Sequence, residues 1–330
     1  MKSQKMKAIV ATAYGNHEVL KLQQVEIPQV KENEILVKVV NASATTADTM
    51  MLTGKPYISR LFMGFNKPKS EIPGTGFAGT VVEIGKHVAQ FKKGDAVFGE
   101  TLFGFASNAE YICIPEDSIV LHKPENLPFS EAAGFCDGHL TSINFLKELG
   151  KITSGQKVLI NGASGSLGTS AVQLAKYFGA EVTGVCSSSN IGLVKSLGAD
   201  FVIDYTKEDF TSLDKKYDII YDTLGKIPFR KAKKALASGG LYLSPVLKAG
   251  LLFSMLRTSV FGRQKAQFAA TGMKPQKQLK ELLNELLVIF HSGNLRTIID
   301  RQFPLEKVAQ AHEYIASGRK KGNVVIVVES

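Results

Sequence analysis

The order of apolar and polar residues changes character near the middle of the chain. Before residue 125, short apolar runs stand between Gly, Pro and Asn residues, a pattern typical of short strands in an irregular β-barrel. The expected strands are 6–10, 34–40, 80–84, 95–99 and 109–114. Pro124 and Pro128 then mark a joint between this region and the next.

From Lys157 onward the pattern predicts strands that alternate with helices. We expect strands at 157–161, 181–186, 201–204, 217–222 and 241–244, and helices at 167–178, 191–197 and 229–237. In the first of these helices Leu167, Ala171, Leu174 and Phe178 share one face. Such an alternation predicts an α/β fold with a doubly wound parallel sheet and right-handed crossovers.

The last third of the chain is less regular. Residues 246–275 show no clear period, and we expect a loop or short helices there. Beyond them we expect a helix with inward leucines over 275–291, a strand over 296–303, a helix over 304–317 and an apolar strand over 323–328.

A glycine turn between the first strand of the second half and its helix is the main functional signal. Gly162, Gly165 and Gly168 stand three residues apart. The first permits a tight turn, the second lets backbone approach a phosphate, and the third lets helix and strand pack closely. The backbone N–H groups around Ser164, Ser166 and Leu167 lie at the expected start of the helix. The turn therefore predicts a site for the pyrophosphate of a dinucleotide. We assign this site to Gly162, Ser164, Gly165, Ser166, Leu167 and Gly168.

The end of the next strand indicates which nicotinamide cofactor is preferred. Sites for NAD commonly carry Asp or Glu there, to bind the ribose hydroxyls. This chain has Cys186-Ser-Ser-Ser-Asn190 and no acid. Hydroxyl groups can donate hydrogen bonds to a 2′-phosphate, whereas a carboxylate would repel it. We therefore predict NADPH as the cofactor, with Ser187, Ser188 and Asn190 in contact with it. Further candidates for the 2′-phosphate are Lys195, Tyr205 and the basic run 319–321.

Composition limits the remaining possibilities. The chain has 330 residues, a net charge of +10 and a pI near 9.3. No apolar run approaches the roughly 18–20 residues of a membrane span. The basic start of the chain lacks the apolar core of a signal peptide. We therefore expect a cytoplasmic protein whose three cysteines are reduced. The positive charge leaves RNA binding open as an alternative role for a nicotinamide-binding protein.

Several motifs together resemble one large family. They are the segments 73–79, 94–99, 131–134, 161–168, 198–205 and 299–305. In this order they are similar to the medium-chain dehydrogenase/reductase superfamily, and more closely to its zinc-free quinone oxidoreductase branch, which includes zeta-crystallin-like and alkenal-reductase-like proteins. The resemblance covers nearly the whole chain.

The resemblance implies a domain arrangement and a set of site residues. A chaperonin-10-like β-barrel catalytic domain would comprise 1–125 and 293–330, with a Rossmann NADPH-binding domain, 126–292, inserted in it. Homodimers are common in such a family. Asn41 and Thr141 would lie beside the nicotinamide, and Phe268 would lie near it. The cofactor channel would be lined by the turn 222–225, which contains Thr223, and by Leu243. Two departures from the family pattern are Gly76, where a polar residue is usual, and Ser189, where Lys or Arg is frequent.

The sequence predicts no metal site. Segments 44–47 and 74–77 replace the Cys and Gly-His-Glu ligands of zinc-dependent relatives, and the six histidines show no ligand spacing. Without zinc nothing stabilises a departing alkoxide, so alcohol oxidation is disfavoured. Reduction of an electron-poor quinone or enone requires less assistance, because the cofactor provides the hydride.

The candidates for the chemistry are few. Asn41 follows an apolar strand, where an amide can polarise a carbonyl oxygen or act only as a turn residue. Thr141 either lines the site or caps a helix. Tyr57 belongs to a loop that could cover the substrate and donate a proton or stack on a ring. His139, Cys136 and solvent complete the alternatives.

These observations predict an NADPH-dependent reductase of quinones or α,β-unsaturated carbonyls. A short-chain alcohol dehydrogenase is disfavoured, because that class places the glycine turn near the N-terminus and requires a Tyr-x-x-x-Lys motif. None of the nine tyrosines here has Lys four residues later.

Overall fold

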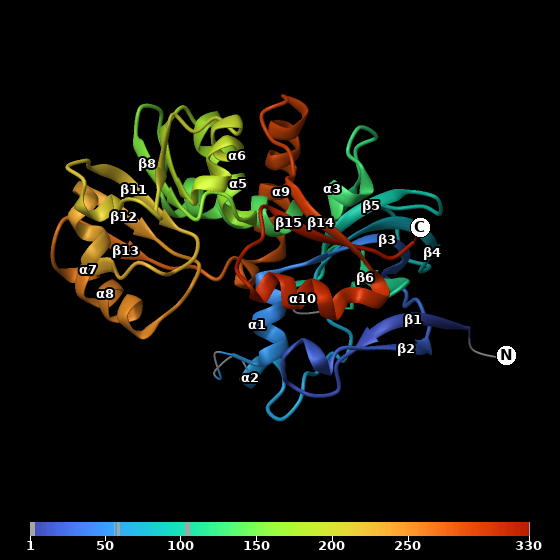
Figure 1. The fold of residues 1–330 in the computed structure, drawn as a ribbon. Coiled ribbons are helices and arrows are strands. Elements are labelled where there is room, and N and C mark those ends of the chain that lie inside the picture. The colour runs from blue at the N-terminus through green and yellow to red at the C-terminus, as the bar shows by residue number, and fades with distance from the viewer. Residues whose placement is uncertain (1–3, 56, 58–59, 103–105, 330) are drawn as a thin grey trace. The chain divides into compact units, whose positions relative to one another are not determined.

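The computed structural model describes residues 4–55, 57, 60–102 and 106–329. The chain divides into two compact units (Figure 1). Unit 1 comprises Met1–Asp137 and Thr297–Ser330, and unit 2 comprises Gly138–Arg296.

Unit 1 is built mainly from β-strands. A seven-stranded sheet has the order β14 (Ile299–Pro304), β15 (Asn323–Val327), β3 (Glu34–Ala44), β4 (Gly76–Ile84), β5 (Ala96–Glu100) and β7 (Ile119–His122), with β6 (Tyr111–Pro115) also paired to β3. A separate antiparallel pair joins β1 (Lys5–Val10) and β2 (Lys21–Glu26). The helices of this unit are α1 (Thr46–Thr53), α2 (Arg60–Met63), α3 (Phe129–Ala133) and α10 (Val308–Ala316).

The expected strands of unit 1 are present, with different ends. β3 continues to Ala44 instead of ending at residue 40, and its register shifts twice where it pairs with β4. The C-terminal strand β14 begins at Ile299 rather than at residue 296, and α10 begins at Val308, after a 3-10 turn at Leu305–Lys307. β2 was not among the expected strands, because it is polar and mostly exposed.

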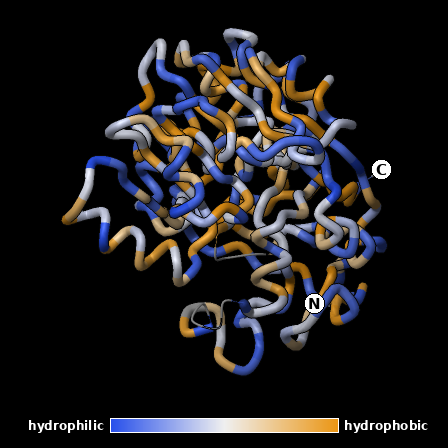
Figure 2. The backbone as a smooth tube through the Cα atoms, turned by 60° about the vertical axis from the view of Figure 1, so that its left-hand side comes forward, coloured by the Kyte–Doolittle hydropathy of each residue, from blue (hydrophilic) through white to orange (hydrophobic). Residues whose placement is uncertain are grey.

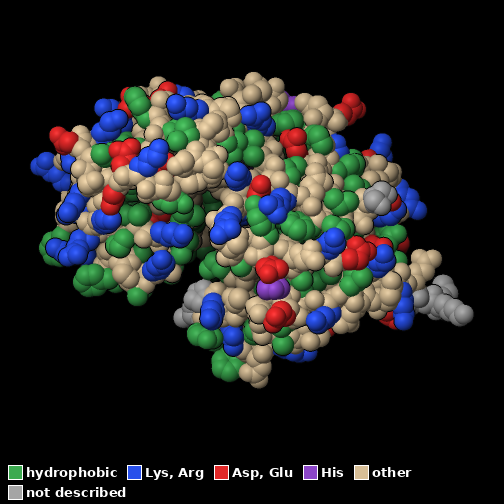
Figure 3. Space-filling model, in the orientation of Figure 1, with side chains coloured by type: hydrophobic (Ala, Val, Ile, Leu, Met, Phe, Trp, Pro, Cys, Tyr) green, Lys and Arg blue, Asp and Glu red, His purple; other side chains and the backbone are tan. Residues whose placement is uncertain are grey.

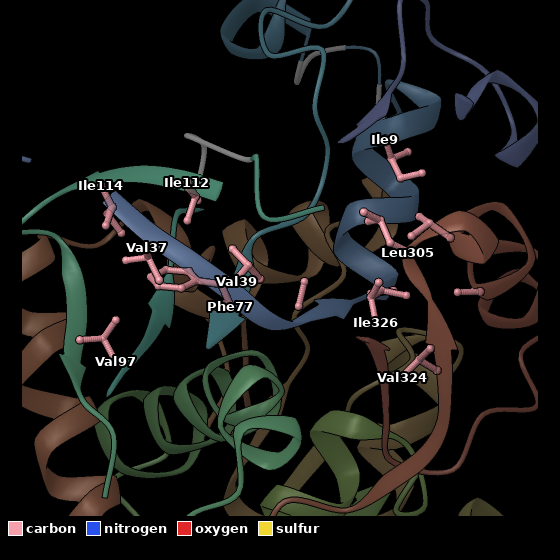
Figure 4. Close-up of a cluster of buried hydrophobic side chains, with 14 of the residues drawn as sticks. Ile9, Val37, Val39, Phe77, Val97, Ile112, Ile114, Leu305, Val324 and Ile326 are labelled. Carbon is pink, nitrogen blue, oxygen red and sulfur yellow. The ribbon is translucent and has the colours of Figure 1, made fainter. Parts of the chain in front are cut away.

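The core of unit 1 gathers side chains from both ends of the chain. Figure 4 shows it with labelled residues Ile9, Val37, Val39, Phe77, Val97, Ile112, Ile114, Leu305, Val324 and Ile326. β3 is central to this core because it pairs with β4, β6 and β15. The C-terminal segment is therefore an integral part of unit 1.

Unit 2 is an α/β unit with one parallel sheet. The strand order is β10 (Phe201–Asp204), β9 (Glu181–Cys186), β8 (Lys157–Asn161), β11 (Tyr217–Asp222), β12 (Leu236–Leu243) and β13 (Lys265–Gln267). All neighbouring strands in it are parallel. The helices are α4 (Thr141–Ile143), α5 (Ser166–Tyr177), α6 (Ile191–Ser196), α7 (Phe229–Ala232), α8 (Ala249–Val260) and α9 (Gln276–His291).

Shorter helical pieces also occur in the described parts of the chain. Wider, π-type turns flank α4 at Cys136–Leu140 and Asn144–Leu149. The 3-10 turns are His17–Val19, Ser188–Asn190, Phe210–Ser212, Lys233–Ala235, Thr271–Met273 and Leu305–Lys307. In the described ranges, no helix combines the length and the apolar composition needed to cross a bilayer.

The doubly wound sheet is confirmed, and its first four strands have the predicted bounds. The strand order places β8 beside both β9 and β11, as in a dinucleotide-binding fold. Figure 2 shows the underlying pattern as short hydrophobic and hydrophilic stretches that follow one another along the backbone. The helix expected over 275–291 is also confirmed as α9, whose Leu279, Leu282, Leu283 and Leu286 are buried.

Two expectations for unit 2 were wrong. The helix expected over 229–237 ends at Ala232, and β12 begins at Leu236, well before residue 241. The strand includes the Gly239–Gly240 pair: Gly239 has a positive φ of 85°, and the strand continues through an irregularity in its pairing with β11. In the ambiguous region 246–275, the chain forms the long helix α8 and the edge strand β13.

The first boundary between the units also differs from the joint expected near residue 125. It lies after Asp137, because α3 packs against β3, β4 and β5 of unit 1. The second boundary lies after Arg296 instead of residue 292.

Candidate functional site

The predicted cofactor residues of unit 2 follow the carboxyl ends of its parallel strands. The glycine turn, which begins at Gly162, follows β8. The loop 187–190, which we call the serine loop, follows β9, and Tyr205 follows β10. Thr223 follows β11, Leu243 ends β12, and Phe268 follows β13. The sheet order reverses between β8 and β11, and ligands of doubly wound sheets bind at the carboxyl edge beside such a reversal.

Two glycines of the turn are required by the protein itself. Gly162 has a φ of 79°, and a Cβ atom there would lie 2.6 Å from the Thr223 hydroxyl oxygen. A Cβ atom on Gly168 would lie 2.1 Å from the carbonyl oxygen of Gly162. The tight turn and the close contact between helix and strand therefore explain both residues.

Gly165 has no such explanation within the protein. Its φ is −81°, which any residue adopts, and a Cβ atom there would meet only the Gly162 carbonyl oxygen, at 3.6 Å. The space beside this residue is open, as it must be for the backbone to approach a ligand closely. The turn therefore fits the pyrophosphate of a dinucleotide.

The start of helix α5 is suited to an anion. Gly165 is its N-cap residue, and no side chain caps the helix. The twelve-residue helix directs its positive dipole end to this point. The Ser142 hydroxyl group donates to the Leu167 carbonyl oxygen at 2.9 Å, so the segment that carries Thr141 is fixed against the same helix end.

The serine loop and the glycine turn are linked by one side chain. Asn190 Nδ2 donates to Ser164 Oγ at 3.0 Å and to Ser187 Oγ at 3.2 Å. Ser188 is exposed, whereas Asn190 is buried. The structure thus brings Ser164, Ser187 and Asn190 together, as residues of one site must be.

An acidic residue that the sequence interpretation missed lies beside this loop. The segment 186–190 itself contains no acid, but Asp204, at the end of β10, accepts a short hydrogen bond from the Ser188 hydroxyl group. This bond and another from Thr206 hold the pKa of Asp204 below its usual value. Asp204 comes after the intervening helix α6, which hides the contact in the sequence.

Asp222 is a second residue that sequence reasoning missed. It is fully buried at the end of β11 and accepts from Asn161 Nδ2 at 2.8 Å and from the Tyr242 hydroxyl group at 2.9 Å. Its carboxylate also accepts from the backbone N–H of Ile227. These bonds join the ends of β8, β11 and β12, so Asp222 positions the turn that carries Thr223.

The remaining candidates of unit 2 differ in exposure. Tyr205 is exposed, and Thr141 and Phe268 are half-buried. Phe268 packs against the core of the unit. The side chain of Leu243 is fully buried, so only its backbone can face a ligand.

In unit 1, Asn41 and Tyr57 lie in different surroundings. Asn41 is buried in β3, and its Nδ2 donates to the Ile326 carbonyl oxygen at 3.4 Å. Tyr57 is exposed, and the Arg60 guanidinium group lies 4.9 Å from the centre of its ring. Its neighbours 56 and 58 lie outside the described residues.

A cluster of carboxyl groups in unit 1 was also missed. Asp48 is buried and closes a capping box with Thr45 at the start of α1, and the Thr75 hydroxyl group donates to it at 3.3 Å. Burial raises the pKa of Asp48 to about 6. Burial, reinforced by the charges of Asp137 and Asp48, raises the pKa of Glu100 to about 8. The spacing of Thr45 and Asp48 is a signal that could have revealed the first of these contacts.

Two candidate proton donors are unsuited to that role. Burial lowers the pKa of His139 to about 3. Its imidazole is therefore neutral at neutral pH, and no imidazolium is present to act as the acid. Burial also raises the pKa of the Cys136 thiol well above its usual value, which leaves it as an inert thiol. Among the described residues, no three His, Cys, Asp or Glu side chains form a group that could hold a metal ion.

Sequence comparisons agree with this geometry. The family described as "Alcohol dehydrogenase GroES-like domain" matches residues 31–125, and the family described as "Zinc-binding dehydrogenase" matches residues 197–326. The 2-methylene-furan-3-one reductase of Solanum lycopersicum is 36% identical over 333 residues, which cover 97% of this chain and 79% of that protein. The chain belongs to the medium-chain dehydrogenase/reductase superfamily.

Other members of the superfamily carry related names. The chloroplastic NADPH-dependent alkenal/one oxidoreductase of Arabidopsis thaliana is 32% identical over 97% of this chain and 79% of its own length. The solved structure of the quinone oxidoreductase from Coxiella burnetii superposes with a TM-score of 0.87 at 29% identity, covering 99% of this chain and all of that one. The predicted quinone oxidoreductase branch and fold are thereby confirmed.

Proposed function

We propose that this protein reduces quinones or α,β-unsaturated carbonyl compounds with NADPH. Unit 2 is the proposed NADPH-binding domain, and unit 1 is the proposed substrate domain. The observation that carries the proposal is the open space beside Gly165, at the carboxyl edge of the sheet, since no residue that the structure describes requires a glycine there. Relatives named as alkenal/one and quinone oxidoreductases support the substrate class.

The glycine turn and the start of α5 hold the pyrophosphate in this proposal, and Thr223, the Leu243 backbone and Phe268 line the remainder of the cofactor site. When bound, the reduced nicotinamide supplies a hydride. Asn41, Thr141 and Tyr57 are the proposed residues beside the reacting groups, where they would orient the acceptor carbonyl by hydrogen bonding. The reaction adds the hydride and one proton to the acceptor, and requires no metal.

The preference for NADPH over NADH rests on the serine loop. Ser187, Ser188 and Asn190 offer hydroxyl and amide groups to a 2′-phosphate. Lys195 lies on the following helix α6, and Tyr205 is tied to the start of the loop, because its N–H donates to the Cys186 carbonyl oxygen at 3.1 Å. Asp204 opposes this preference, because its charge repels a phosphate and because its carboxylate already accepts the hydrogen bond of the Ser188 hydroxyl group. We therefore place the protein as an NADPH enzyme whose discrimination against NADH is limited by Asp204.

The proposed assembly is a homodimer, and the proposed location is the cytoplasm. β13 is the last strand of the unit 2 sheet in the described part of the chain, and the Ala266 N–H of this strand donates to Thr258 Oγ1 of α8. The proposed homodimer therefore rests on the family resemblance. Light scattering on the purified protein tests the dimer. A mass that matches one chain at all concentrations would contradict it.

One experiment tests the function directly. NADPH oxidation is followed with a panel of quinones, enones, aldehydes and alcohols, and the products are identified. Turnover should occur with quinones or enones and give hydroquinones or saturated ketones, and it should persist after dialysis against a chelator. Oxidation of alcohols alone, or loss of activity that only zinc restores, would refute the proposal.

A further inference from the structure

Positive charge is concentrated in one part of unit 2. Residues 223–280 contain twelve Lys or Arg residues and no Asp or Glu. The remainder of the chain therefore has 28 basic residues against all 30 acidic ones, so this one segment accounts for the whole excess of positive charge. It contains α7, α8 and β13.

Helix α8 is apolar on two opposite faces. Leu251 and Met255 pack into the core of unit 2. On the other side, Phe253, Leu256 and Val260 are 68%, 65% and 73% exposed. These three lie at positions i, i+3 and i+7 and therefore share one stripe of the helix surface. We name them, with the exposed Leu252 and Phe261, the outer face of α8.

Basic residues border the outer face of α8. Lys248 precedes the helix, Arg257 lies on it, and Arg263 follows it. All three are exposed. Figure 3 shows Lys and Arg side chains mixed with hydrophobic ones where Figure 1 places α7 and α8. The surface thus combines bulky apolar side chains with cations and lacks acidic residues from its own segment.

This chemistry selects among possible partners. A second copy of the same face would bring cations against cations, which is unfavourable. A nucleic acid would attract the cations but would not need a stripe of leucine, valine and phenylalanine. An anionic bilayer satisfies both features, because its phosphates attract the cations while its acyl boundary accepts the apolar side chains.

We propose that the outer face of α8 binds the surface of anionic membranes. The helix lies parallel to the bilayer plane, Phe253, Leu256 and Val260 enter the acyl boundary, and Arg257 and Arg263 lie at the phosphate level. The protein is held at the surface without spanning the bilayer. Apolar quinones and enones concentrate in the same layer, so the proposed enzyme would be placed beside its acceptors.

Vesicle flotation with the full chain, without nucleotide, tests the proposal independently of the enzyme activity. One set of vesicles is phosphatidylcholine alone, and the other is phosphatidylcholine and phosphatidylglycerol at about three to one. The protein should float with the anionic vesicles only, and binding should weaken when salt rises from about 50 mM to about 500 mM. Equal binding to both vesicles, or no binding to either, would overturn the proposal.

A matched pair of variants locates the binding surface. Leu256 and Val288 are 65% and 64% exposed on helices α8 and α9 of the same unit. Leu256→Gln should weaken anionic vesicle binding about tenfold, because one buried leucine is lost, whereas Val288→Gln should leave it unchanged. Equal losses in both variants would contradict the assignment to α8.

Two further outcomes would identify a different partner. If wild-type protein fails to bind vesicles and Leu256→Gln lowers its mass in sedimentation, the outer face joins two copies of the chain. If wild-type protein binds single-stranded RNA and does not bind the vesicles, the basic segment 223–280 is a nucleic-acid-binding surface. Either result excludes a membrane surface as the partner.

Discussion

The glycine turn of unit 2 and the carboxyl cluster of unit 1 are constructed in contrasting ways. Gly162–Gly168 is one continuous stretch that runs from the end of β8 into the first turn of α5, and it presents mainly backbone groups. Asp48, Glu100 and Asp137 come from α1, β5 and the segment after α3, and they present ionisable side chains. The backbone N–H groups of the turn do not titrate near neutral pH, whereas burial raises the pKa values of the Asp48 and Glu100 carboxyl groups.

This difference determines how each region responds to change. A backbone site is lost when an added side chain fills its space, and it does not respond to moderate pH changes. The carboxyl cluster, in which Asp48 is buried and Glu100 and Asp137 are half-buried, keeps its shape when an isosteric amide replaces a carboxyl group. Its contribution to the stability of the protein changes with pH. Substitutions in the two regions therefore have separable readouts.

The largest expected effect is that of Gly165→Val. The side chain enters the space that we assign to the pyrophosphate, so the dissociation constant for NADPH should rise at least about 100-fold, equivalent to about 2.8 kcal/mol. The melting temperature should change little, because the residue has a φ of −81° and open space beside it. Fluorescence titration and calorimetry measure the two quantities. Unchanged NADPH affinity would remove the assigned turn.

Gly168→Ala separates the two roles within the turn. The new Cβ atom would lie 2.1 Å from the Gly162 carbonyl oxygen and 2.7 Å from Ala163 Cα, so helix and turn must move apart. The free energy of unfolding should fall by about 1–3 kcal/mol. Urea denaturation without nucleotide measures it. A variant as stable as wild type, with only its NADPH affinity reduced, would show that Gly168 also serves the ligand directly.

Glu100→Gln tests the pH response of the carboxyl cluster. The pKa of Glu100 is raised from 4.5 to about 8, so the unfolded chain releases this proton at lower pH than the folded protein does. This group therefore costs the folded state increasing stability as pH rises from about 4.5 through 8, by at most about 1.4 kcal/mol per pH unit. The variant should lose this slope and be the more stable protein at pH 7, as measured by urea denaturation at several pH values.

Asp209 provides the control with the opposite sign. The ion pair with Lys231 lowers the pKa of Asp209 to about 2, so the stability from this group is present above pH 4 and is lost as pH falls through 2. Asp209→Asn should therefore leave the slope between about pH 5 and pH 8 unaltered. A wild-type slope in Glu100→Gln would show that this carboxyl group is not the source.

The smallest expected effect is a change in cofactor preference. Asp204→Asn removes a charge beside Ser188 and leaves at most a neutral, weaker acceptor for the serine hydroxyl group, which can then donate to a phosphate more readily. NADPH should bind about threefold to tenfold more tightly, with NADH little affected. Asp200→Asn, at the other end of β10 and paired with Lys176, is the control and should not change the ratio. A weaker affinity for NADPH in Asp204→Asn would show that the carboxylate positions the serine loop for the phosphate.

Much of unit 2 could be predicted because its determinants are local. Each buried strand is a short apolar run, each helix has its own period, and the glycines of the turn are adjacent in sequence. The prediction failed where local signals conflict, as at Gly239, where a glycine lies within a strand and does not end it. The region that forms α8 gave no clear period because both faces of the helix are apolar.

The sequence by itself determined the parallel sheet, the turn after β8 and the concentration of positive charge over 223–280, because these depend on neighbours along the chain. Only the tertiary structure decided that Asp204 reaches Ser188, that Asp222 joins three strand ends, and that the half-buried Glu100 lies near the buried Asp48. Hydrogen bonds and burial depend on which strand ends meet. The spacing of residues along the chain does not tell which strand ends are neighbours, since the crossover connections between strands differ in length and direction.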